Sequence, residues 1–231
     1  MLKLDHITLE LGNQTVLRDI SFEVDPGEMV AILGISGAGK SSLFRLLTGE
    51  LHPTKGEIFL DDFSFASLTP ASLQNYRRQI GVAFQDFRLL PKKSVFDNIA
   101  FALEVCGEDE KITKKVPELL ELVGLSHRSE ALPHELSGGE KQRTAIARSL
   151  VHDPKILIAD EITGNLDPRN SRDIADLLQH LHLTQGLTVL FSTHDPVLVE
   201  AISPRVIRLE EGKILFDKKD CSLEKAFEGV L

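Results

Sequence analysis

Hydrophobic residues in this chain recur at two spacings, and each spacing predicts a different kind of element. Apolar and polar side chains alternate over residues 4–11 and 20–24, which is typical of strands with one buried face. Apolar runs such as Met29–Leu33 and Ile80–Phe84 are typical of strands inside a parallel sheet. In all, we predict strands at 4–11, 20–24, 29–33, 56–60, 80–84, 155–159 and 187–191, with two more on either side of Glu211-Gly212.

Helices are predicted where apolar positions recur at helical spacing and capping residues bound the segment. Thr69 and Ser94 are N-cap residues for helices at 70–79 and 94–105. Gly124 ends a helix that begins near Lys111. Other helices are predicted at 40–47, 137–150, 168–183 and 196–202.

The order of these elements predicts a single α/β domain spanning residues 1–231. Its core is a mostly parallel sheet built from about 1–85 and 154–217, and the two alternating strands at the start add an antiparallel β layer. The segment at about 86–153 is mainly helical, which predicts an inserted helical subdomain. Residues 218–231 form a short C-terminal tail.

Composition narrows the class of protein. The 231 residues are 42% hydrophobic, which is enough for a buried core. The 26 Lys and Arg against 35 Asp and Glu give a net charge of −9, which argues against a nucleic-acid-binding surface. Cys106 and Cys221 lack nearby Cys or His at metal-binding spacing, which suits a reducing compartment. Because no apolar run approaches the ~20 residues of a membrane span, and the start is too polar for a signal peptide, we expect any membrane role to act through a partner.

The stretch Gly34–Ser41 lies between the apolar strand 29–33 and the helix that begins near Lys40. It fits the P-loop pattern G-x-x-x-x-G-K-[ST] in the strand–loop–helix context that the pattern requires. Glycines let backbone N–H groups turn inward around an anion, and the helix N-terminus adds its positive dipole end. We therefore predict a nucleoside triphosphate site, with Lys40 on the β- and γ-phosphates and the Ser41 hydroxyl on Mg²⁺. The predicted contacts are Gly34, Ser36, Gly37, Ala38, Gly39, Lys40, Ser41 and Ser42.

Asp160 and Glu161 follow directly after the strand at 155–159. The carboxyl ends of parallel strands form the sheet edge where phosphate ligands bind, so both acids are expected beside the loop. We expect Asp160 to hold Mg²⁺, directly or through water, and Glu161 to orient and deprotonate the attacking water.

Ser137-Gly138-Gly139 opens the helix at 137–150, so this second helix N-terminus also suits phosphate. The segment Leu136–Glu140 resembles the L-S-G-G-[EQ] signature of ABC-type ATPases. The P-loop, Gln85, this signature, Asp160-Glu161, Asp167 and His194 occur in the order of that family, and the resemblance covers essentially the whole chain. It implies the P-loop NTPase fold of an ABC ATPase domain that hydrolyses ATP with Mg²⁺.

The resemblance also implies a homodimer in which two chains close around two ATP molecules. Ser137 and Gly139, with Gly138 between them, would contact the γ-phosphate held by the other chain, and Asp167 would lie at the interface. His194 would reach the γ-phosphate in the transition state. Gln85 would contact Mg²⁺ or the attacking water and sense a membrane partner.

Two positions depart from the family pattern. Leu11 stands where an aromatic residue usually stacks on adenine, and it shares a strand face with Ile7 and Leu9, so it is either a weak base contact or part of the core. We therefore predict poor discrimination between ATP and GTP. Ile162 stands where proline usually follows the catalytic Glu, which affects only the expected loop geometry.

The segment Phe84–Phe101 is similar to bacterial cell-division ATPases within this family. That resemblance implies a polytopic membrane partner docking near residues 85–96, control of cell-wall hydrolases, and a peripheral location on the cytoplasmic face of the inner membrane. Independently, an exposed apolar patch in the loop at 87–91 predicts a docking surface, against the alternative that the loop packs on its own domain.

Other functions stay open from the sequence. The chain is also similar to ATPase subunits of lipoprotein-releasing and macrolide-exporting transporters, and an ATPase subunit does not reveal the cargo. A soluble ABC protein of translation or DNA repair usually has two ATPase domains or a long coiled coil, and neither is present here. The signature motif and the missing N-K-x-D motif argue against a small-molecule kinase or a GTPase.

Overall fold

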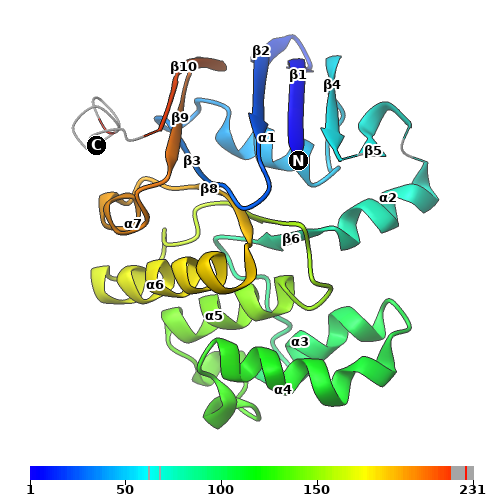
Figure 1. The fold of residues 1–231 in the computed structure, drawn as a ribbon, viewed down its shortest axis with the longest axis vertical. Helices are drawn as coiled ribbons and strands as arrows, with labels where there is room; N and C mark the ends of the chain where they lie inside the picture. The colour runs from blue at the N-terminus through cyan, green and yellow to red at the C-terminus, as the bar shows by residue number, and fades with distance from the viewer. Residues whose placement is uncertain (62, 68, 220–226, 228–231) are drawn as a thin grey trace.

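The computed structural model describes residues 1–61, 63–67, 69–219 and 227, and these form two β-sheets (Figure 1). The smaller sheet is antiparallel, as predicted, and the larger one is mostly parallel, with β10 antiparallel to its neighbour β9. In spatial order the smaller sheet contains β2 (Gln14–Val24), β1 (Leu2–Leu11), β4 (Lys55–Leu60) and β5 (Phe63–Ser64). The larger contains β10 (Lys213–Lys218), β9 (Arg205–Glu210), β3 (Met29–Leu33), β8 (Thr188–Ser192), β7 (Ile156–Ala159) and β6 (Ile80–Ala83).

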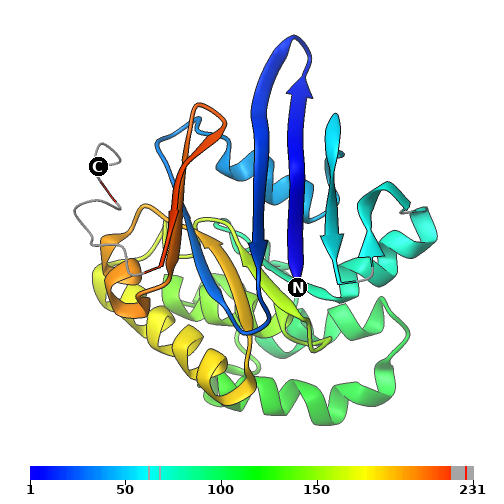
Figure 2. The ribbon, with the colours of Figure 1, turned by 45° about the horizontal axis from the view of Figure 1, so that its top comes forward.

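The larger sheet is buried on both faces, which explains why its strands are apolar without alternation. In β3, Ala31 and Leu33 belong to the core on the side of helices α3–α7, whereas Val30 and Ile32 belong to the core shared with α1 and the antiparallel sheet. Figure 2 shows the antiparallel strands rising above the larger sheet, with α1 on the same side as these strands and α3–α6 packed below the sheet. The predicted α/β fold with an antiparallel β layer is confirmed.

The helices begin at the predicted caps. Thr69 accepts a hydrogen bond from the Ser72 backbone N–H ahead of α2, and Ser94 accepts one from the Asp97 backbone N–H ahead of α3. In Figure 1, α3, α4, α5 and α6 lie together on one side of the larger sheet. The helices are α1 (Lys40–Leu47), α2 (Pro70–Arg78), α3 (Val95–Glu104), α4 (Ile112–Leu122), α5 (Gly138–Ser149), α6 (Pro168–Gln185) and α7 (Pro196–Ile202).

Some boundaries differ from the predicted ones. β2 begins at Gln14 rather than at residue 20, because residues 14–19 pair with β1. The helix expected from Lys111 begins with the 3-10 turn Asp109–Lys111 and becomes α-helical at Ile112. The sequence pattern missed β5 and the three-residue 3-10 turns, since elements this short do not complete a hydrophobic period.

Two further expectations concern membranes and the end of the chain. Within residues 1–61, 63–67, 69–219 and 227, no helix is both long and apolar enough to span a membrane. Cys221 and most of the predicted tail at 218–231 lie outside the described residues.

Candidate functional site

The glycine loop at 34–39 leads from the end of β3 into the first turn of α1. Gly39 is the N-cap residue of α1 and has the left-handed φ of 105°. Among the residues that the structure describes, no side chain caps this N-terminus, and its first turn contains no acidic residue. The backbone N–H groups of the first turn and the positive end of the helix dipole are therefore available to an anion.

Lys40 lies over the same loop. Its ammonium group donates hydrogen bonds to the backbone oxygens of Gly34, at 2.7 Å, and Ile35, at 3.2 Å. Gly34 approaches the neighbouring strand so closely that an added Cβ would lie 2.4 Å from the Leu209 carbonyl oxygen. A loop that requires glycine for its close approach and that places a cation above its own backbone fits a phosphate-binding cradle.

Asp160 and Glu161 lie where β7 ends, between the ends of β6 and β8. Ser192, the last residue of β8, connects them: its hydroxyl donates to Asp160 Oδ1 at 2.6 Å and accepts from the Glu161 backbone N–H at 2.9 Å. Ser192 is fully buried, and we did not predict it from the sequence. Its position at the end of a strand, two residues before His194, was the available sequence indication.

A cavity of about 440 Å³ joins the glycine-loop helix to the end of β7, because Ser41 and Asp160 both line it. The hydroxyl and carboxylate oxygens of these two residues are suitable ligands for Mg²⁺. Among the described residues, no group of three or more His, Cys, Asp or Glu side chains is arranged to hold a metal ion. Mg²⁺ would therefore depend on phosphate oxygens in addition to these two protein ligands, which is the usual arrangement for this ion. The remaining lining residues are Phe44, Arg45, Thr48, Glu50, Val82, Phe84, Arg88 and Ile158.

Glu161 is held by both its backbone and its side chain. Its φ of 52° is left-handed, a conformation that costs a non-glycine residue about 1–2 kcal/mol and that is concentrated at functional sites. Glu161 Oε2 lies 2.5 Å from His194 Nδ1. The Glu161 side chain is 18% exposed and that of His194 is 55% exposed, so the pair faces solvent mainly through the imidazole. The predicted base and the predicted γ-phosphate contact are thus in direct contact with each other.

Gln85 follows β6 and packs against the loop that carries Asp167. The Asn165 side chain donates to the Gln85 carbonyl oxygen at 2.9 Å, and a Cβ on Gly164 would lie 2.9 Å from Gln85 Nε2. Asp167 is the N-cap residue of α6 and accepts from the backbone N–H groups of residues 169 and 170, each at 3.0 Å. The hydrogen bonds from Asn170 and from the Arg169 N–H lower the pKa of Asp167.

The Ser137–Gly139 turn contacts this same loop rather than only its own helix. Gly138 approaches Leu166 of the loop, and a Cβ on Gly139 would lie 2.2 Å from Oδ1 of Asn170 in the first turn of α6, so a larger residue at 139 would displace the Asn170 side chain that bonds Asp167. Ser137 caps α5 by accepting from the Glu140 N–H at 3.2 Å, and Glu140 accepts from the Ser137 N–H at 2.8 Å. That backbone hydrogen bond, together with Arg128, lowers the pKa of Glu140 to about 2.

Leu11 and Ile162, the two positions that depart from the family pattern, have different surroundings. Leu11 is 40% exposed at the end of β1, so the alternative that it belongs to the core is wrong. Ile162 is 1% exposed and packs in the core below the sheet, which explains how an apolar residue other than proline is accommodated there.

The loop at 86–93 is less exposed than predicted. Pro91 is exposed, but Phe87, Leu89 and Leu90 are only half-exposed, which corrects the expectation of a fully exposed patch. The reason is that two side chains from outside the loop hold it, one from the helix that follows the loop and one from α5. Arg148 donates to the carbonyl oxygens of Phe87 and Arg88 at 2.8 and 2.6 Å, and the buried Asn98 bonds both the N–H and the carbonyl oxygen of Leu90. We did not predict either role, since neither residue type signals a loop contact.

Comparison with known proteins gives a consistent family. The sequence profile described as ABC transporter matches residues 17–164. The cell division ATP-binding protein FtsE of Streptococcus pneumoniae serotype 2 (strain D39) is 48% identical over 205 residues, which cover 88% of this chain and 89% of that protein. The methionine import ATP-binding protein MetN 1 of Yersinia pestis bv. Antiqua (strain Antiqua) is 42% identical over 220 residues, or 93% of this chain and 64% of that protein.

A solved structure agrees with these sequence matches. It is a dimeric ATP-binding cassette in a post-hydrolysis state bound to ADP and Pi, and it superposes with a TM-score of 0.83. The two sequences are 31% identical, and the match covers 96% of this chain and all of that one.

Proposed function

Since this chain belongs to the ABC transporter family and is an ATP-hydrolysing subunit, we propose that its glycine loop, Asp160, Glu161 and His194 form one half of an ATP site that a second copy completes. The observation that carries this proposal is the meeting of three elements at one sheet edge. The uncapped N-terminus of α1 lies at the end of β3, the two acids lie at the end of β7, and His194 contacts Glu161.

Each residue has a role that its position supports. The glycine loop and Lys40 would bind the phosphates. Ser41 and Asp160 would hold Mg²⁺, and the ion would offset charge on the β- and γ-phosphates, while Gln85 would contact Mg²⁺ or the attacking water. Glu161 takes a proton from the water that attacks the γ-phosphorus, so that phosphate forms and ADP leaves. His194 holds the Glu161 carboxylate through Nδ1–H and, when its ring carries a second proton, donates through Nε2–H toward the γ-phosphate as charge develops there.

The second copy supplies the Ser137–Gly139 turn to the γ-phosphate. That turn lies close to Leu166 and Asn170, and therefore beside Asp167. Closure of the dimer would therefore change the surroundings of the loop that carries Asp167 and also contacts Gln85. The dimeric state of the ADP-bound and Pi-bound cassette that this chain resembles supports the homodimer. If the base reaches Leu11, which is exposed at the end of β1, this aliphatic side chain would offer only a weak stacking surface.

We further propose that dimer closure acts on a polytopic, FtsX-like membrane protein and controls cell-wall hydrolysis during bacterial cell division. The similarity to FtsE over most of both chains supports this biological role. In this role the chain is a peripheral subunit held at the cytoplasmic face of the inner membrane by its partner. Partner binding near residues 85–96 is supported by the exposed Pro91 and by the 38% exposed Phe101 on α3 close to that loop, where Lys93 Nζ lies 5.2 Å from the Phe101 ring centre.

Depletion of the protein in the cells that produce it tests the biological role. We expect filamentous cells that fail to divide, and wild-type protein but not Lys40→Ala should restore division. Normal division together with failed lipoprotein sorting would contradict the cell-division role and support an export transporter instead.

Site-specific crosslinking tests the docking surface. A photoreactive residue at position 89 or 92 is expected to capture a polytopic membrane protein. The matched control positions are 183 and 114, because Leu183 is 80% exposed on α6 and Lys114 is exposed on α4. Equal capture of membrane protein from both pairs of positions, or none from either, would contradict docking at residues 85–96.

A transport role is the second candidate, and the similarity to MetN 1 favours it. An import complex needs a solute-binding component outside the membrane, whereas a cell-division complex does not. Co-purification with such a solute-binding protein, in place of division proteins, would support this second function.

A further inference from the structure

The hairpin formed by β9 and β10 runs beside the strand that leads into the glycine loop. β9 pairs in parallel with β3, with residues 205–208 opposite residues 30–33. The hairpin turns through Glu211 and Gly212, whose φ angles are 47° and 75°. Two successive positive φ angles are typical of a tight two-residue hairpin turn, and this conformation alone favours glycine at position 212.

Gly212 also contacts the glycine loop directly. Its N–H donates to the Ala38 carbonyl oxygen at 3.2 Å, and its own carbonyl oxygen accepts from the Arg18 N–H of β2 at 2.7 Å. A Cβ added to Gly212 would lie 2.2 Å from the Val16 carbonyl oxygen. Position 212 therefore requires glycine for two reasons, its φ angle and the close approach of β2.

The contact with Ala38 fixes a group that faces the ligand. A peptide unit is planar and trans, so its C=O and N–H groups point in opposite directions. Ala38 C=O belongs to the same unit as Gly39 N–H. When Gly212 holds the carbonyl oxygen from one side, the Gly39 N–H must point to the opposite side, where at the start of α1 it could bind an anion.

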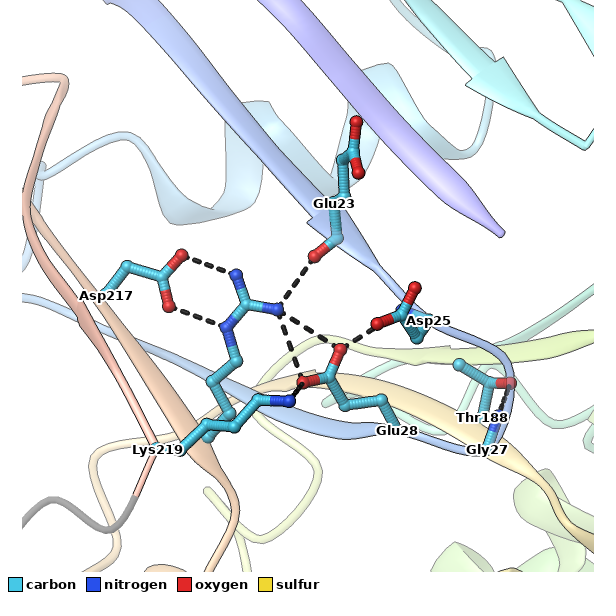
Figure 3. Close-up of polar contacts among 8 residues, drawn as sticks. Glu23, Asp25, Gly27, Glu28, Thr188, Asp217 and Lys219 are labelled. Atoms are coloured by element: carbon cyan, nitrogen blue, oxygen red, sulfur yellow. Dashed lines mark hydrogen bonds and ion pairs between the residues drawn. The ribbon is translucent and has the colours of Figure 1, made fainter.

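The base of the hairpin is fixed by a cluster of charged residues (Figure 3). Arg205 on β9 pairs with Asp217 on β10 through two hydrogen bonds, one of them 2.6 Å from Nε to Oδ1. Arg205 also donates to Glu28 at 3.1 Å and to the Glu23 carbonyl oxygen at 2.8 Å. Lys219 adds a second cation on Glu28, at 3.2 Å. The cluster therefore joins the hairpin to the turn between β2 and β3.

We propose that Gly212 is a positioning residue for nucleotide binding, and that the β9–β10 hairpin, anchored by Arg205, holds the Ala38–Gly39 peptide in its phosphate-binding orientation. This role rests on the proposed phosphate site at residues 34–41. Glycine has no side chain, so Gly212 acts only through its backbone. Its effect is on nucleotide affinity rather than on the proton transfer at Glu161.

The substitution Gly212→Ala tests the role, with Gly124→Ala as the matched control. Gly124 has a similar φ of 69°, but a Cβ there meets no atom of the described residues within 4 Å, so the control reproduces the backbone strain without the collision. We expect Gly212→Ala to weaken ADP and ATP binding by about tenfold and to raise KM more than it lowers kcat. Gly124→Ala should bind nucleotide like the wild type, even if its Tm falls by as much as that of Gly212→Ala.

The Asp217→Asn variant tests the anchor without changing the turn residue. It weakens the pair with Arg205, and a smaller loss of about two- to threefold in nucleotide affinity is expected because the turn contact itself remains. Asp176→Asn is its control for the loss of a carboxylate, since Asp176 forms a single exposed contact with Arg172 on α6, at 3.5 Å. Wild-type protein that fails to bind ADP would contradict the phosphate site itself. A different result would contradict only the role of the hairpin. In that case the wild type binds ADP, and neither Gly212→Ala nor Asp217→Asn weakens this binding more than its control variant does.

Discussion

Two helix N-termini in this protein are assigned to the same phosphate, yet they are built differently. α1 begins after Gly39 with no side-chain cap and no acid in its first turn. α5 begins after Ser137 with a complete capping box, and Glu140 in its first turn is ionised down to low pH. The first N-terminus has unpaired donors for an anion, whereas the second has already satisfied part of its donors internally.

This difference indicates a division of labour. A helix end that lacks a cap is destabilising unless an anion binds to it, so α1 is suited to holding nucleotide within one chain. A capped end keeps its shape without ligand, and Glu140 opposes a phosphate nearby. We therefore expect α5 to contribute only when the dimer closes around a nucleotide that α1 already holds.

The largest effect is expected at α1. Lys40→Ala removes the cation above the glycine loop and should lower ATP affinity and turnover by about 10²-fold or more. Nucleotide titration on the purified protein measures this, with Lys114→Ala on the exposed face of α4 as control. If Lys40→Ala bound ATP as tightly as the control, α1 would not be the primary site.

Glu161→Gln should nearly abolish turnover, by about 10²-fold or more, while leaving ATP bound, since the amide cannot accept the proton from water. With hydrolysis blocked, ATP should hold two chains together, which light scattering detects as a dimer. Near-normal hydrolysis by this variant would mean that another group is the base.

Ser137→Asp separates the two N-termini. Aspartate is also a good N-cap, so α5 should stay formed, but its charge would repel the γ-phosphate across the dimer. In the Glu161→Gln background, we expect ATP-dependent dimerisation to weaken by about tenfold and nucleotide affinity of the single chain to stay unchanged. Thr69→Asp, at the exposed cap of α2, controls for the substitution itself. Weaker nucleotide binding by single chains would show that α5 acts within its own chain.

The smallest effect concerns the stability of the capped end. Glu140→Gln removes an ionised partner of the Ser137 N–H and of Arg128, and should lower the free energy of unfolding by about 1 kcal/mol at neutral pH. Because the folded pKa of Glu140, about 2, lies below its ordinary value of 4.5, its contribution is complete above pH 4.5 and is lost as pH falls toward 2.

Urea unfolding of the wild type and of Glu140→Gln, repeated between pH 7 and pH 2.5, measures this contribution. The difference in the free energy of unfolding between the two proteins should become smaller as the pH falls. A difference that is constant over this range would mean that the charge of Glu140 does not stabilise the cap.

The sequence by itself determined the elements and the chemistry that each strand end presents. Gly34–Ser41, the acids after β7 and the caps Thr69, Ser94 and Ser137 were predictable because each depends on residues close together in the chain. Hydrophobic spacing likewise predicted which strands are buried on both faces. Boundaries were less predictable, as β2 shows, because pairing with β1 extends it through residues without a clear alternation.

Only the tertiary structure decided which of these residues touch. The contacts of Glu161 with His194, of Ser192 with Asp160, of Arg148 with the loop at Phe87 and of Gly212 with Ala38 join residues far apart in sequence. Such contacts depend on strand order and on how closely two backbones approach, neither of which has a local sequence pattern. In sequence Gly212 is one more turn glycine, and its contact with the phosphate loop exists only because β9 lies beside β3.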